Sequence, residues 1–260
     1  MKYLNIGCGG NYNKDWINLD LYKSEHVKYH NIKKKLPFSD DSVDVIYHSH
    51  VLEHLDKYEA KRFIDDCFRV LKTGGVMRVV VPDLEQIARE YLDNMEKGFK
   101  SMDEEDILNY NWNKIEMFDQ VVRRIIGGDM IEVLKNGEFN KDYVSKRNGD
   151  EVDSILKNIK YKNKGLKSSI FNFVSKNDLL FNFLSIFVKK LNPQKSGEAH
   201  KWMYDKLDLR ILLEDSGFKD FSILKYNESS IKNWEEYALD KSSLGDFPRK
   251  PDSLFVEVKK

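Results

Sequence analysis

The chain has 260 residues, with 43 basic and 43 acidic side chains and therefore a formal net charge of zero. Its length suits a single α/β domain with a sizeable insertion, and the balanced charge argues against a nucleic-acid partner, which usually needs a basic surplus. Two cysteines are too few for a disulfide framework, and no apolar run approaches the roughly 18 residues that span a membrane. The amino terminus enters a strand without a signal-peptide pattern, so we expect a cytoplasmic protein.

The first part of the chain alternates strands with a helix, which is typical of a parallel sheet with helical crossovers. The expected strands are residues 3–6, 16–19, 27–32, 43–48 and 76–81. A helix is expected over residues 58–71, and Gly74 and Gly75 would end it before the fifth strand.

Beyond residue 83 the strand pattern gives way to charged amphipathic segments. Helices are expected over residues 85–97, 113–126 and 166–190. Alternation then returns, with a helix over 207–215, a cap at Gly217 and strands over 218–226 and 253–258. Because the last strands need the first five for pairing, we expect one α/β fold with a seven-stranded, mostly parallel sheet. Residues 1–84 and 203–260 would form its core, and residues 85–202 a helical insertion between strands five and six.

A glycine turn follows the first strand at Gly7, Cys8 and Gly9, and the second strand ends on Asp20. Glycines let the backbone approach a ligand closely, and a carboxylate there accepts hydrogen bonds from ribose hydroxyls. The dinucleotide pattern would need a glycine where Tyr12 stands, and an acid roughly 20 residues further on. The turn therefore favours a nucleoside cofactor other than NAD or FAD.

The short glycine turn with an early acid resembles class I S-adenosylmethionine (SAM) methyltransferases, whose fold is a Rossmann-like α/β sheet. Residues 36–46 resemble the segment that leads into the fourth strand in this family. Residues 65–75 resemble the family's helix and the glycine turn that precedes its fifth strand. Segments 197–205 and 250–255 resemble a bacterial subgroup that often accompanies surface-polysaccharide genes. The resemblance implies SAM as cofactor and S-adenosylhomocysteine as product, and the scheme requires no metal.

The resemblance also implies how the cofactor is held. Gly7 and Gly9 would let the methionine portion of SAM lie close to the backbone, and Asp20 would bind the ribose hydroxyls. Adenine would meet Asn31 through a hydrogen bond and Ile32 through packing. For Asp20 an ordinary turn carboxylate is the alternative. The full predicted set is Gly7, Cys8, Gly9, Asp20, Asn31, Ile32 and Ser49.

Two histidines stand at the end of the fourth strand, where open α/β sheets bind their ligands. His48 and His50 share one side of an extended strand, so both are candidates for the base that takes a proton from the acceptor. Either could instead shape the turn, and His200 is a third candidate. No Asn-Pro-Pro-Tyr-like motif follows this strand, which favours oxygen over amide or base nitrogen as the acceptor and leaves small-molecule nitrogen as an alternative.

The same stretch offers a rival interpretation. His50-x-x-Glu53-His54 matches the signature of inverted zinc proteases, which requires a continuous helix and a further acidic ligand. A zinc hydrolase is therefore one alternative. A non-catalytic subunit that binds SAM is another.

The insertion is expected to supply the acceptor pocket. On its helix 113–126, Asp119 and Arg123 share one face, and Gln120 and Arg124 a neighbouring one. Arginines there would hold a phosphate or carboxylate, although a solvated, salt-bridged face is the alternative.

The short loop before the helix 207–215 carries Glu198, His200, Trp202 and Tyr204, which are residue types that suit a sugar. Trp202 could instead anchor the insertion to the core. The apolar run within residues 166–190 has lysines at its ends and could contact a membrane surface or a second copy of the chain, with burial as the default.

Together these features predict methyl transfer from SAM to a small, anionic acceptor. The expected acceptor is a sugar hydroxyl, or a sugar-linked intermediate with a phosphate-type oxygen, in capsule or other surface-glycan biosynthesis.

Overall fold

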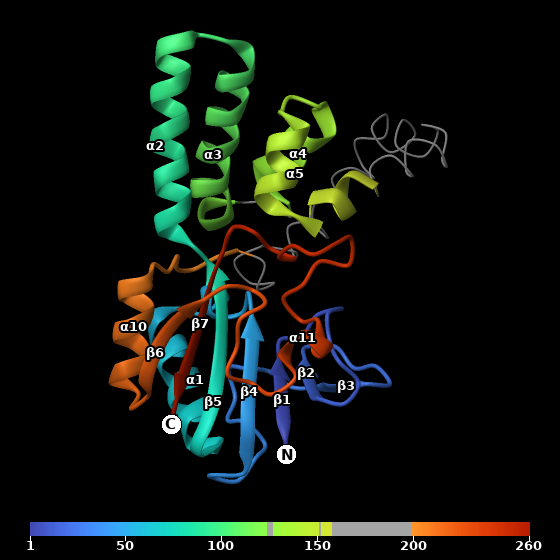
Figure 1. The fold of residues 1–260 in the computed structure, drawn as a ribbon, viewed down its shortest axis with the longest axis vertical. Helices are drawn as coiled ribbons and strands as arrows, with labels where there is room; N and C mark the ends of the chain where they lie inside the picture. The colour runs from blue at the N-terminus through green and yellow to red at the C-terminus, as the bar shows by residue number, and fades with distance from the viewer. Residues whose placement is uncertain (124–126, 151, 158–198) are drawn as a thin grey trace, which may run out of the picture. The chain divides into compact units, whose positions relative to one another are not determined.

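The computed structural model describes residues 1–123, 127–150, 152–157 and 199–260. The chain divides into two compact units (Figure 1). The sheet unit comprises Met1–Gln86 and Lys201–Lys260, and the helical unit comprises Ile87–His200.

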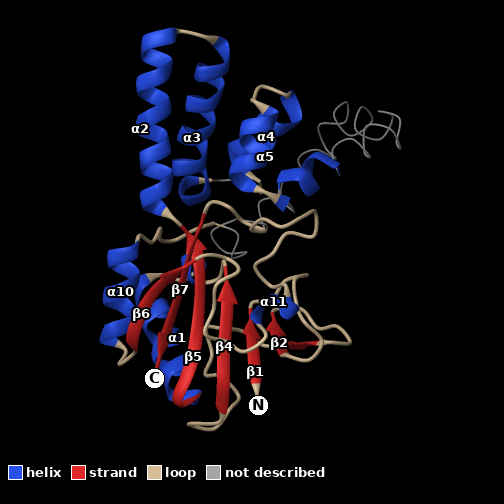
Figure 2. Cartoon of the chain, viewed as in Figure 1, coloured by secondary structure: helices blue, strands red, loops and turns tan. Residues whose placement is uncertain are grey.

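Seven strands form one sheet in the order β3-β2-β1-β4-β5-β7-β6 (Figure 2). They are β1 (Tyr3–Ile6), β2 (Ile17–Asp20), β3 (Val27–Tyr29), β4 (Val43–Ser49), β5 (Leu71–Pro82), β6 (Lys219–Leu224) and β7 (Ser253–Lys259). All neighbours pair in parallel except β7, which runs antiparallel to both β5 and β6. The predicted seven-stranded, mostly parallel α/β sheet is confirmed.

The helices of the sheet unit are η1 (Leu52–His54), α1 (Lys57–Val70), α10 (Lys206–Asp215) and α11 (Trp234–Tyr237). A reciprocal capping box fixes the start of α1. The N–H of Glu59 donates to the Asp56 carboxylate at 2.8 Å, and the N–H of Asp56 donates to the Glu59 carboxylate at 3.2 Å. The box satisfies N–H groups that lack partners within the helix and thereby sets the length of the loop between β4 and α1.

The two faces of the sheet bury different side chains. Along β4, Ile46 joins a large aliphatic cluster with residues of α1 and α10, such as Phe63 and Leu209. Its neighbour Tyr47 joins a second, more aromatic cluster that includes Trp234 of α11. This alternation follows from the period of two in a strand, and burial on both faces explains the apolar runs 45–47 in β4 and 79–82 in β5.

The glycine pair before the fifth strand has a different role from the predicted one. Helix α1 ends at Val70, and β5 begins immediately at Leu71, so Gly74 and Gly75 do not end the helix. Instead, the pairing of β4 with β5 shifts its register between Val43 and Val45, opposite this glycine-containing stretch. Gly74 has φ +77°, which a glycine adopts without strain. The pair therefore forms an irregularity within β5.

The helical unit contains α2 (Leu84–Ser101, which begins in the sheet unit), α3 (Glu104–Val122), α4 (Gly128–Asn136) and α5 (Lys141–Asn148). Helix α3 begins and ends earlier than residues 113–126 predicted. Gly127 follows as the N-cap of α4, with φ +79°. The predicted helix 166–190 lies outside the described residues. None of the helices within the described ranges combines the length and apolar character needed to cross a bilayer.

Candidate functional site

The turn after β1 depends on two glycines with positive φ, +66° at Gly7 and +52° at Gly9. The N–H groups of Gly7 and Cys8 both donate to the carbonyl of Leu19, at 2.8 and 3.2 Å. A Cβ on Gly7 would collide with a methyl group of Val51, whereas a Cβ on Gly9 would meet nothing within 4 Å. Gly7 is thus needed for packing, and Gly9 leaves open space beside the backbone.

Asp20, the last residue of β2, faces this open space. Its Oδ2 accepts a hydrogen bond from Gly9 N at 2.8 Å, and its Oδ1 accepts one from Leu21 N at 2.6 Å. Each carboxylate oxygen keeps a further lone pair for a ligand. Open space at Gly9 next to an oriented, partly exposed carboxylate fits the ribose of a nucleoside cofactor.

Cys8 lies in the same turn, but its thiol has no nucleophilic character. Burial, with the negative charge of Asp20 as a second cause, raises the pKa of Cys8 to about 12. The side chain therefore stays protonated near neutral pH, where it neither attacks an electrophile nor binds a metal as thiolate.

The two residues predicted to meet adenine follow β3. The N–H of His30 donates to the carbonyl of Asp20 at 2.7 Å, which keeps this segment beside the end of β2. The side-chain oxygen of Asn31 accepts from Lys33 N at 2.9 Å, and Ile32 packs against the aliphatic cluster. Both contacts shape the loop, and the adenine roles of Asn31 and Ile32 stay predictions.

His48 and His50 do not share one environment, as their spacing had predicted. The His48 ring is fully buried, 5.3 Å from the Phe63 ring. Burial lowers the pKa of His48 to about 3, so the ring stays neutral and out of reach of an acceptor. The expectation failed because extended geometry ends at Ser49: His50 has φ +54° and leaves the strand direction. Ser49 itself is partly buried, and its predicted cofactor contact stays a prediction.

His50 is the histidine that the sheet unit presents at the carboxyl end of β4. Its backbone N–H donates to the carbonyl of Val80 at 2.9 Å. Its Nδ1 lies 3.2 Å from Oε1 of Glu53, and its Nε2 lies 2.8 Å from the hydroxyl of Ser253. The side chains of His50 and Glu53 are 12% and 0% exposed. An imidazole with a carboxylate near one ring nitrogen and a hydroxyl hydrogen-bonded to the other is an arrangement suited to moving a proton.

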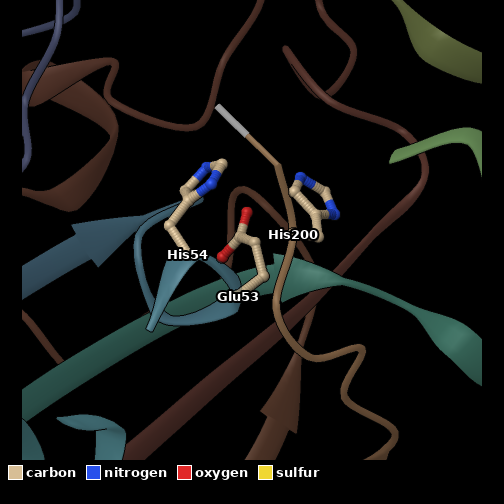
Figure 3. A group of neighbouring side chains, drawn as sticks. All are labelled: Glu53, His54 and His200. Carbon is tan, nitrogen blue, oxygen red and sulfur yellow. The ribbon is translucent and has the colours of Figure 1, made fainter. Parts of the chain in front are cut away.

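The zinc-protease interpretation of this stretch is wrong in its geometry. Such a site needs both histidines on one continuous helix, but residues 52–54 form only the short 3₁₀ helix η1, and His50 precedes it. Figure 3 draws Glu53 and His54 on this turn and also labels His200, the last residue of the helical unit.

The predicted acceptor-binding residues of α3 have structural partners. Arg123 donates to the Asp119 carboxylate at 2.8 Å, and the other oxygen of Asp119 accepts from Asp129 N at 2.7 Å in the first turn of α4. This pair stabilises the start of α4 rather than standing ready for an anion. The carbonyl of Gln120 accepts from the N–H of His200 at 2.8 Å. Arg124 lies outside the described residues.

The loop residues after the insertion are mainly buried. Trp202 packs against the aliphatic cluster, donates from Nε1 to Asp208, and has the ammonium of Lys57 3.7 Å from its ring centroid. Tyr204 is buried in the same cluster, which raises the pKa of its phenol. These contacts all lie within the sheet unit and give both residues a packing role, and their predicted roles in acceptor binding stay predictions. The side chain of His200 is buried, and Glu198 lies outside the described residues.

The sequence reasoning missed Ser253 and gave Glu53 only a metal-binding role. Glu53 could have been found from its position three residues after His50. Ser253 could have been found only from topology. Because β7 is antiparallel, its first residue pairs with Pro82 at the end of β5, which places Ser253 at the same sheet edge as His50.

Comparison with known proteins supports the cofactor assignment. Residues 11–79 match the family model of a methyltransferase domain. A stretch of 98 residues is 34% identical to a probable S-adenosylmethionine-dependent methyltransferase of Mycolicibacterium smegmatis, covering 31% of this chain and 37% of that protein. A protein of Mycobacterium tuberculosis with the same description is 32% identical over 98 residues, covering 31% of this chain and 35% of its own. The matches thus span little more than a third of these curated relatives.

Solved structures with similar folds include a SAM-dependent methyltransferase from Thermotoga maritima, with a TM-score of 0.43 and 14% identity over 100% of this chain and 82% of that one. A second is a SAM-dependent methyltransferase from Archaeoglobus fulgidus, with a TM-score of 0.41 and 13% identity. That match covers 100% of this chain and 86% of the other. The sheet order and the family match, rather than these overlaps, support the assignment. Residues 11–79 are therefore similar to a SAM-dependent methyltransferase domain, and this match supports SAM as the cofactor.

Proposed function

We propose that the chain transfers the methyl group of SAM to a hydroxyl oxygen of a small sugar or sugar-linked acceptor in surface-glycan biosynthesis. His50 is the observation that carries the choice of oxygen. A hydroxyl must lose its proton as it is methylated, and His50 offers an imidazole at the carboxyl end of β4, 3.2 Å from the Glu53 carboxylate. Histidine suits this task near neutral pH.

The cofactor part of the site requires few residues. Gly7 and Gly9 would let the backbone lie close to the cofactor. Asp20 would accept hydrogen bonds from the ribose hydroxyls through the lone pairs that its bonds to Gly9 N and Leu21 N leave unused. When bound, SAM supplies a methyl group on a sulfonium that leaves readily. The chain's own contribution is then to orient the acceptor and remove its proton.

The nature of the acceptor rests on other observations. Segments 197–205 and 250–255 resemble the subgroup that accompanies surface-polysaccharide genes, and the zero net charge argues against a nucleic acid. The expectation of an anionic acceptor rested partly on Arg123, and Arg123 is paired with Asp119. We therefore propose a small acceptor chosen by its hydroxyl groups rather than by its charge.

The test is transfer of a ¹³C-labelled methyl group from SAM to a panel of nucleotide sugars and simple glycosides. The carbon shift of the product separates O-methyl from N-methyl and S-methyl groups. We expect an O-methyl product from the wild-type chain, and roughly 100-fold slower transfer by His50→Gln with SAM binding retained. An N-methyl or S-methyl product, or unchanged transfer by His50→Gln, would contradict the proposal.

A further inference from the structure

His50, Glu53 and Ser253 form a linear chain of side chains within the sheet unit. Oε1 of Glu53 is 3.2 Å from Nδ1 of His50, and Nε2 of His50 is 2.8 Å from Oγ of Ser253. The three residues come from the end of β4, from η1 and from the first position of β7. Segments that are far apart in sequence thus meet at one imidazole.

The chemistry of the two neighbours decides which ring nitrogen carries the proton. An ionised carboxylate can only accept hydrogen bonds, whereas a serine hydroxyl can donate or accept. A neutral imidazole beside both is best satisfied with its proton on Nδ1, facing Glu53, and its lone pair on Nε2, facing Ser253. Glu53 is fully buried, so bulk water does not compete for this position.

Backbone hydrogen bonds fix the positions of both His50 and Glu53. His50 has φ +54°, an unfavourable value for a residue with a Cβ, and its N–H is bonded to Val80 O at 2.9 Å. The carbonyl of Glu53 accepts from Lys201 N at 2.7 Å and from Trp202 N at 3.3 Å. The fold therefore maintains a costly backbone conformation where it aims the imidazole at Ser253.

We propose that Glu53 is a positioning residue that holds His50 in the Nδ1–H tautomer, and that Ser253 relays the acceptor's proton to Nε2 of His50. This inference rests on the proposed function. As the carbon–oxygen bond forms and the carbon–sulfur bond breaks, the acceptor proton passes to Oγ of Ser253, and the hydroxyl proton of Ser253 passes to Nε2. The positive charge lost from sulfur ends on the His50 imidazolium, beside the Glu53 carboxylate.

The tautomer can be measured without any acceptor. Nitrogen-15 NMR of the imidazoles in the full-length chain, with His50 assigned by comparison with His50→Gln, reports which ring nitrogen carries the proton. We expect the Nδ1–H tautomer for the wild type and its loss as the dominant form in Glu53→Gln. Glu25→Gln is the matched control, because Glu25 is an exposed carboxylate 3.8 Å from another histidine, His26. An Nε2–H tautomer of His50 in the wild type would overturn the inference.

Kinetics then separate the two roles. We expect Glu53→Gln to lower kcat roughly 100-fold with an unchanged KM for SAM. Ser253→Ala should also lower kcat, and Ser253→Thr, which keeps a hydroxyl, should restore most of it. Wild-type turnover in Ser253→Ala, or covalent labelling of Ser253 by a fluorophosphonate, would overturn the relay, the latter because Ser253 would then be a nucleophile.

Failure of the proposed function has a different signature. It would appear as no transfer to any hydroxyl by the wild-type chain, with the Nδ1–H tautomer present and dependent on Glu53. Failure of this inference would appear as the other tautomer, or as unchanged kcat in Glu53→Gln, in a chain that does transfer methyl groups.

Discussion

The sheet unit buries apolar side chains on both faces of its central strands, whereas the helical unit places a polar network beside a small apolar cluster. Among the described residues, the buried members of that cluster are Trp112, Leu134, Val144 and Val152. Hydrogen bonds link the buried polar side chains next to it, which are those of Asn94, Asn113, Glu116, Arg147 and Asn148. A hydrogen bond adds little net stability when formed, but a buried group that loses its partner costs more. The helical unit should therefore be the more sensitive to polar substitutions.

The sheet unit also has a buried polar centre, at Arg78 of β5. The side chain is 0% exposed. Its guanidinium donates to the carboxylates of Asp240 and Glu257 and to the carbonyls of Glu228, Lys225 and Tyr226. The indole of Trp234 lies 4.6 Å from it. These bonds attach much of the long connection between β6 and β7 to the sheet.

The largest effect is expected from Arg78→Met. The substitution would leave two carboxylates buried without their common cation, which costs about 3–5 kcal/mol of unfolding free energy. Urea denaturation followed by circular dichroism measures this loss. Arg210→Met is the matched control on the exposed surface of α10, where loss of the Glu214 pair should cost less than about 1 kcal/mol. Equal losses in both variants would show that the buried centre has no special role.

A smaller effect, confined to the other unit, is expected from Glu116→Ala. Glu116 accepts from Arg147 Nε at 3.1 Å and from the side-chain amide of Asn148 at 3.0 Å. Removing this acceptor should cost about 2–3 kcal/mol. Hydrogen exchange should accelerate in α3 and α5 and stay unchanged in the sheet.

The matched control for this substitution is Glu132→Ala on α4, whose exposed carboxylate pairs with Lys135. It should leave hydrogen exchange nearly as in the wild type. Acceleration that spreads equally to β4 and β5 in Glu116→Ala would contradict the contrast between the units.

The effect that is smallest at neutral pH concerns His48 and develops only as the pH falls. Burial lowers the pKa of His48 from 6.5 to about 3, so below pH 6.5 the unfolded chain binds a proton that the folded chain does not. The shifted pKa of His48 therefore leaves the free energy of unfolding unchanged above pH 6.5. As the pH falls from 6.5 towards 3, it lowers the free energy of unfolding by at most about 1.4 kcal/mol per pH unit. His48→Leu should lack this part of the slope in unfolding curves measured between pH 6.5 and 4. Identical slopes in the two proteins would show that His48 is not buried as a neutral ring.

The parts of the fold that sequence could predict are those with local signals. Strand periodicity and turn residues predicted the seven strands, and Gly7 and Gly9 predicted the turn after β1. Gly74 and Gly75 misled because a glycine pair has the same local signal at a helix end and at an irregularity within a strand. Only the register of β4 against β5 separates these two cases.

The parts that sequence could not predict depend on pairing between distant residues. Arg78 resembles any solvated arginine until β7 and the segment around Asp240 are placed beside it. Ser253 becomes a partner of His50 only when β7 runs antiparallel. The shared environment expected for His48 and His50 failed for a local reason, since one left-handed residue breaks the period of two.

Calorimetric titration of the full-length chain with S-adenosylhomocysteine tests the central claim most directly, because it needs no acceptor. The account predicts saturable binding at one site, loss of that binding in Asp20→Ala, and its retention in Asp15→Ala, which removes an exposed carboxylate from the loop before β2. No binding by the folded wild-type chain, or equal binding by Asp20→Ala, would contradict the assignment of the glycine turn and Asp20 as the cofactor site.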